Sequence, residues 1–153
     1  AILGILAAVG IVSFGGFLGS AKENAVKTQV NDTAKFIELK MTECSINPSS
    51  MNLYTPDNWN VYDTNPGHCV HSIMSNIKRG IMNHISWTWN QFNVYEPKQQ
   101  ALFSSDNTNP SQGYIHFLHY EEKDRKYFLL YANLGDHLPL EERFYKREIN
   151  FWE

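Results

Sequence analysis

The sequence predicts an α+β fold in which a long N-terminal α-helix forms a spine packed on a small antiparallel β-sheet, with one short helix beside it. Three observations predict this fold. Residues 1–19 contain no ionisable side chain, residues 20–44 are charged but keep a helical apolar period, and three segments with strand-like alternation follow one another near the C-terminus. The length of 153 residues suits one domain with an appendage. We therefore divide the chain into a helix over residues 1–44 and a globular head over residues 45–153.

The first segment, AILGILAAVGIVSFGGFLG, is apolar throughout except for Ser13. As a helix it would rise roughly 28 Å, close to the thickness of the hydrocarbon core of a bilayer. It shows no polar stripe of the kind that a buried helix of a soluble protein normally has. A cleavable signal peptide is the competing interpretation, because residues 19–21 are small, but the lack of a basic leader and the length of the run favour a retained helix.

Glycine is concentrated in this apolar segment, which holds five of the nine glycines of the chain. Gly15 and Gly19 have the four-residue spacing that lets apolar helices approach closely. Each glycine also weakens a helix by about 1 kcal/mol relative to alanine. We expect close helix packing and local helix flexibility at Gly10, Gly15, Gly16 and Gly19. Composition alone indicates a simple membrane anchor.

Residues 20–44 continue the helix with an amphipathic pattern. The charges of this segment sum to zero, and we expect ion pairs along the helix at Glu23–Lys27, Lys35–Glu38 and Lys40–Glu43. With no proline before Pro48, one continuous helix of about 44 residues is predicted, roughly 65 Å long. The apolar stripe recurs at spacings of three or four: Val26, Val30, Ala34, Ile37, Met41 and Cys44.

The segment AILGILAAVGIVSF resembles the N-terminal helix of type IV pilins and the related pseudopilins. Members of this superfamily begin with a short F-T-L-I-E-L-like stretch followed by a similar apolar run. The likeness is close over about the first 20 residues, and the amphipathic continuation agrees in character. It implies a structural subunit of a type IV pilus, a helical homopolymer that serves adhesion, motility or DNA uptake, with a head of three or four strands.

The resemblance also implies partners, a location and a packing surface. The subunit would sit in the inner membrane before assembly, meet the pilus assembly machinery, and end in an extracellular filament with no cofactor. The expected filament core consists of apolar side chains: Ile2, Leu3, Ile5, Leu6, Val9, Ile11, Phe14, Phe17 and Leu18.

Two departures from the pilin pattern affect what can be carried over. The processed start with its methylated phenylalanine is absent, and Ala1 would fall about ten residues into the usual processed protein. Val12 stands where many members have a proline that accompanies helix unwinding in the filament, and we expect the Gly15–Gly16 pair to support a similar unwinding. The alternatives are a pseudopilin of a type II secretion system and a monomeric binding domain anchored by a single span.

The head is predicted as a loop, a helix and a meander of strands. Residues 45–67 are rich in Asn, Pro, Ser and Asp and indicate a long loop, and residues 69–85 have the period of an amphipathic helix. The segment from 86 to 103 is ambiguous, and residues 104–113 resemble another loop. Strands are expected at 114–121, 126–133 and 143–152, paired antiparallel, with the amphipathic half of the long helix covering one face.

Few candidate sites emerge from the head. Cys44 and Cys69 suit a disulfide in an oxidising compartment, in agreement with the single head disulfide of many pilins, and two buried free thiols are the alternative. Two histidine pairs, 68/71 and 116/119, resemble metal ligands, but a strand would point His116 and His119 to opposite faces. The acidic loops at 57–63 and 105–109 lack the full calcium-loop pattern. We therefore predict no metal site.

Neither enzyme activity nor nucleic-acid binding is indicated. No catalytic motif, phosphate-binding glycine loop or zinc-protease motif is present in the sequence. The net charge of −3 gives no basic surface for phosphates, so no specific nucleic-acid partner is expected. We expect a structural protein with no catalytic residue and no cofactor-binding residue.

Overall fold

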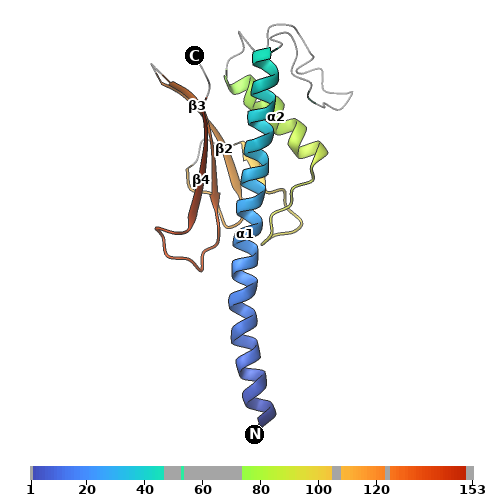
Figure 1. Ribbon diagram of the computed structural model, residues 1–153, viewed down its shortest axis with the longest axis vertical. Helices are drawn as coiled ribbons and strands as arrows, with labels where there is room; N and C mark the ends of the chain where they lie inside the picture. The colour runs from blue at the N-terminus through green and yellow to red at the C-terminus, as the bar shows by residue number, and fades with distance from the viewer. Residues whose placement is uncertain (1, 47–52, 54–73, 105–107, 123–124, 151–153) are drawn as a thin grey trace.

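The computed structural model describes residues 2–46, 53, 74–104, 108–122 and 125–150 (Figure 1). Within these residues it confirms the α+β class, the long N-terminal helix and one shorter helix. The two helices are α1, Ile2–Ile46, and α2, Met74–Thr88. The strands are β1, Leu102–Ser104; β2, Ile115–Glu122; β3, Arg125–Asn133; and β4, Phe144–Asn150.

The four strands form one mixed sheet in the order β1-β2-β3-β4. The pairs β2–β3 and β3–β4 are antiparallel, as predicted, but β1 lies parallel to β2. The prediction of an all-antiparallel sheet is therefore wrong at this edge. The physical reason is the connection: the chain leaves β1 through a long segment, not a tight hairpin turn, and returns to the same end of the sheet before β2 begins.

One face of the sheet is apolar, and both helices cover it. The register places Ile115 and Phe117 of β2 beside Ala132 and Leu130 of β3 on this face. Helix α1 packs along β3 and β4, and α2 packs along β1 and β2. Burial confirms the predicted stripe of α1, since each of these side chains is at most 5% exposed: Val26, Val30, Ala34, Ile37, Met41 and Cys44.

Polar contacts fix α1 against β4. The Tyr145 hydroxyl is 3.1 Å from Oδ1 of Asn31, and Nη2 of Arg147 is 3.2 Å from Oε1 of Glu38. The predicted Lys40–Glu43 pair is confirmed at 2.8 Å. The predicted partners of Glu23 and Glu38 are wrong, because His137 and Arg147 of the head approach these carboxylates instead of the helical lysines.

Helix α2 follows the predicted period with different bounds. It begins at Met74 and ends at Thr88, three residues beyond the expected end, while residues 69–73 lie outside the described part of the chain. Ile77, Ile81 and Ile85 are buried on one face, as expected. The strand β1 was not predicted, because its three residues are too few to show an alternating pattern.

Candidate assembly surface on the projecting helix

The part of α1 before Gly19 extends beyond the head, and no other described helix or strand lies beside it (Figure 1). Of the predicted core side chains, three are described, and all are exposed: Phe14 is 72%, Phe17 71% and Leu18 53% exposed. The other six belong to residues whose backbone is helical but whose side chains lie outside the described part of the chain: Ile2, Leu3, Ile5, Leu6, Val9 and Ile11. Exposed aromatic side chains on the uncharged end of α1 form an apolar surface that the described part of the chain leaves uncovered.

The glycines of this segment leave open space on the helix. A Cβ atom built on Gly4, Gly15 or Gly16 would meet no other atom within 4 Å. At Gly19 the same Cβ atom would lie 3.3 Å from Nε2 of His137, so the head begins at this residue. Of the predicted pair, Gly15 is therefore available to another helix, whereas Gly19 is already approached by the head.

The unwinding of the helix that we predict at the glycines would occur in the assembled filament. In the single chain, α1 is helical without interruption from Ile2 to Ile46, through Gly10 and the Gly15–Gly16 pair. Unwinding at these glycines stays a prediction about a filament.

Two loops of the head hold α1 where it leaves the head. Nε2 of His137 lies 2.9 Å from Oε1 of Glu23, and the ammonium group of Lys22 lies over the ring of Tyr95, 4.8 Å from its centroid. These contacts come from different segments, the β3–β4 loop and the loop after α2. Both engage consecutive residues of the helix, so they fix its direction relative to the sheet.

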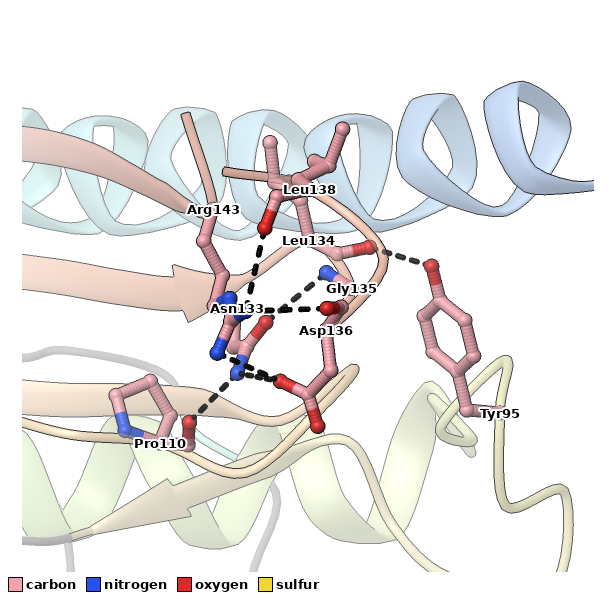
Figure 2. A network of polar contacts seen from close by, with 8 residues as sticks. All are labelled: Tyr95, Pro110, Asn133, Leu134, Gly135, Asp136, Leu138 and Arg143. Atoms are coloured by element: carbon pink, nitrogen blue, oxygen red, sulfur yellow. Dashed lines mark hydrogen bonds and ion pairs between the residues drawn. The ribbon is translucent and has the colours of Figure 1, made fainter. Parts of the chain in front are cut away.

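The β3–β4 loop is itself built by a polar network (Figure 2). The buried Asn133 donates from Nδ2 to the carbonyl oxygen of Pro110 at 3.1 Å and to Oδ1 of Asp136 at 3.2 Å, and it accepts from the Gly135 amide at 2.9 Å. Arg143 donates to the carbonyl oxygen of Asp136 at 3.0 Å and forms an ion pair with its carboxylate at 3.4 Å. The loop that carries His137 is thus anchored from within the head.

Tyr95 connects the two loops. Its hydroxyl donates to the carbonyl oxygen of Leu134, as Figure 2 shows. Burial, followed by the negative charge of Glu23, raises the pKa of Tyr95, which keeps this donor protonated. Gly135 has a φ of +151°, and a Cβ atom there would lie 2.7 Å from the Tyr95 hydroxyl oxygen, so only glycine lets the loop pass this close.

Sequence reasoning found the apolar half of the helix but not the residues that hold it. The contacts of Lys22, Glu23, Tyr95 and His137 join positions more than 70 residues apart, and no spacing rule indicates such pairs. Gly135 within Leu134–Asp136 was a recognisable turn signal, but it did not show which helix the turn would contact.

At the other predicted sites, only some of the residues belong to the described part of the chain. Cys44 is buried at the end of α1 and is disulfide-bonded, not a free thiol, but Cys69 lies outside the described residues, so their pairing stays a prediction. The residues 57–63, 68/71 and 105–107 also lie outside them. His116 and His119 do fall on opposite faces of β2, as expected. Within the described ranges, no three acidic, histidine or cysteine side chains gather as metal ligands would.

We find no helix with the length and apolarity of a membrane span in the part of the chain that the structure describes. Comparison of the chain with known protein families, with curated proteins and with solved structures gave no match.

Proposed function

We propose that this chain is a structural subunit of a filament of the type IV pilus kind, a helical homopolymer held together by the apolar halves of its N-terminal helices. The observation that carries the proposal is the contrast between the two halves of α1. The stripe from Val26 to Met41 is buried against the sheet, whereas Phe14 and Phe17 are more than 70% exposed on a segment with no charge.

Removing the projecting part of α1 from water is energetically favourable. Residues 2–18 extend about 26 Å as a helix, and each large apolar side chain contributes roughly 1.5–3 kcal/mol when it is fully removed from water. The occupant that covers such a segment must itself be apolar, elongated and free of charge. A second copy of the same segment meets these conditions, and the open space at Gly15 and Gly16 allows close approach.

The junction of helix and head suits a repeating assembly. A filament needs every subunit to present its helix at one angle to its head, because a variable angle would prevent regular packing. The contacts His137–Glu23 and Tyr95–Lys22 supply that constraint from two separate loops. The heads would then lie outside a core of packed helices.

The proposal includes the biological setting that the pilin-like helix implies. The unassembled subunit is stored in the inner membrane, is handed to an assembly machinery, and ends in an extracellular pilus that serves adhesion, motility or DNA uptake. The competing possibilities are a periplasmic pseudopilin filament and a lone anchored domain.

Replacement of Gly15 by leucine tests the proposal. A Cβ atom at Gly15 has open space around it within 4 Å, so the head should fold and melt as before, whereas close-packed helices would be forced apart. We expect pelletable filaments in cells producing the unchanged chain and a loss of most of them in the variant. Gly19→Leu is a poorer choice, because its Cβ atom would already press on His137.

The control is Thr108→Leu, which places the same apolar side chain at an exposed position of the head. Filaments confined to the periplasm would favour a pseudopilin. Equal assembly of Gly15→Leu and the control, or a monomeric chain in every case, would contradict close packing at this helix.

A further inference from the structure

A cleft of about 440 Å³ lies at the β1–β2 edge of the sheet. Phe103 and His116 are register partners on the sheet face opposite to the helices, so the cleft opens away from α1. The cleft is shallow and largely open to solvent, and its volume falls within the range of about 300–1,000 Å³ that small-molecule sites occupy. The described lining residues are Glu96, Phe103, Asn109, Ser111, Tyr114 and His116.

Two aromatic rings form a corner of this cleft. The centroids of Phe103 and Tyr114 are 5.2 Å apart, with an angle of 60° between the ring planes. Phe103 is 40% exposed, so a ligand in the cleft can reach its ring. The face of an aromatic ring carries partial negative charge and attracts a cation that is placed over it.

The carboxylate of Glu96 lies beside the hydroxyl group of Tyr114. Tyr114 donates its hydroxyl proton to Oε2 of Glu96 at 2.8 Å, which leaves Oε1 available to a ligand. The hydrogen bond to Glu96 is the main cause that raises the pKa of Tyr114, so the phenol stays a donor. Among the lining residues that the structure describes there is no lysine or arginine, and the described contacts of Glu96 include no cation.

The two loops that carry Glu96 and Tyr114 are tied together by a buried side chain. Asn93 is fully buried, accepts from the amides of Tyr95 and Glu96 at 2.8 and 3.2 Å, and donates to the carbonyl oxygen of Gln112 at 2.9 Å. Gly113 has a φ of +75°, and a Cβ atom there would lie 2.2 Å from Oδ1 of Asn93. The backbone segments that carry Glu96 and Tyr114 are therefore fixed relative to one another before any ligand binds.

We propose that this cleft binds a small organic cation, an alkylammonium or quaternary ammonium group, between the Phe103–Tyr114 corner and the Glu96 carboxylate. An anion would be repelled by Glu96, and a neutral alkyl group would gain only contact with the rings. A cation gains both the attraction of the ring faces and that of the carboxylate. The proposal does not depend on filament assembly, because the cleft belongs to the head alone.

Titration with choline tests the proposal, with 3,3-dimethylbutan-1-ol as its neutral isostere. The full chain is kept in a polyoxyethylene-ether detergent, which has neither a sugar nor a choline headgroup, and amide shifts of Phe103, Tyr114 and His116 are followed by NMR. A short peptide that contains trimethyllysine provides a second arm, because tighter binding of the peptide than of choline would indicate a protein-borne ammonium group. We expect saturable shifts with choline or the peptide and none with the isostere.

Two variants assign the binding to the cleft. Glu96→Gln keeps the size of the side chain and an acceptor for Tyr114 but removes the charge, and Phe103→Leu removes one ring. Each should weaken choline binding about fivefold or more, while Glu142→Gln, an exposed carboxylate elsewhere on the head, should leave it unchanged. The proposal would be overturned by equal shifts with choline and the isostere, or by the lack of any saturable shift. It would also be overturned if Glu96→Gln melted normally and bound choline as tightly as the unchanged chain.

Discussion

The side chain of Asn93 makes three hydrogen bonds that join the segment after α2 to the segment before β2. Asn93 is itself fully buried, and alanine in its place would leave two backbone amides and one carbonyl oxygen, in part-buried hydrogen bonds, without these partners. We expect Asn93→Ala to lower the free energy of unfolding by about 2–3 kcal/mol, measured by urea denaturation. Asn24→Ala, at an exposed position of α1, should change it by less than about 0.5 kcal/mol. Equal effects of the two substitutions would contradict this role.

His84 should make the stability of the head depend on pH. Its ring stacks on Phe36 with centroids 4.9 Å apart, and burial, followed by the positive charge of Lys40, lowers its pKa from 6.5. The unfolded chain therefore binds a proton more readily than the folded chain. The contribution of His84 is fully present above pH 6.5 and is lost as the pH falls through the lowered pKa of the folded state.

The variant His84→Phe isolates this contribution, because phenylalanine can stack on Phe36 but does not titrate. Denaturation midpoints over a pH series should fall more steeply below pH 6.5 for the unchanged chain than for the variant. Parallel curves would show that His84 does not cause the acid sensitivity.

At the residue scale, local periodicity in the sequence predicts which side chains of a helix are buried. Val26 and Ile37 were placed in the core by their spacing alone, and both are fully buried. The roles of Asn93 and His84 could not be predicted, because each depends on partners that the tertiary fold brings from distant segments. For the same reason Glu23 pairs with His137 and not with Lys27, one helical turn away.

The stability of the helix–sheet packing depends on one stripe of α1. Ile37 is fully buried against the sheet, whereas Leu39, two positions away and an isomer of the same size, is 56% exposed. We expect Ile37→Ala to lower the free energy of unfolding by about 2–5 kcal/mol and Leu39→Ala by less than about 1 kcal/mol. Urea denaturation of the two variants compares the same loss of volume on the two sides of one helix. Similar losses would mean that α1 does not pack as described.

At the scale of elements, long periodic segments were predictable and short ones were not. The strands β2, β3 and β4 each begin within a residue of their expected positions, because seven to nine residues suffice to show alternation. The strand β1 has three residues, and its parallel pairing is decided by the path of the connection and not by its own composition. Leu118 interrupts the alternation of β2 because it is buried on the outer face, among the large side chains of that face.

At the scale of the whole molecule, folding and assembly use different surfaces of the chain. Phe17 is 71% exposed, so Phe17→Asp should leave the melting temperature of the head unchanged. In a packed helical core the same carboxylate would be buried without a partner, at a cost of several kcal/mol per subunit. We expect the variant to fold but not to form pelletable filaments, as checked by circular dichroism and sedimentation. Assembly at the normal level would show that Phe17 does not lie in a dry core, and unfolding of the head would show that it has a role within the subunit.

Electron cryo-microscopy of sheared surface material from cells producing this chain tests the proposed assembly most directly. We expect a filament built of this chain, with the helices of residues 2–18 packed together at its centre and the sheets facing outward. A chain that is found only as single subunits, or a filament whose core does not contain residues 2–18, would contradict the proposal.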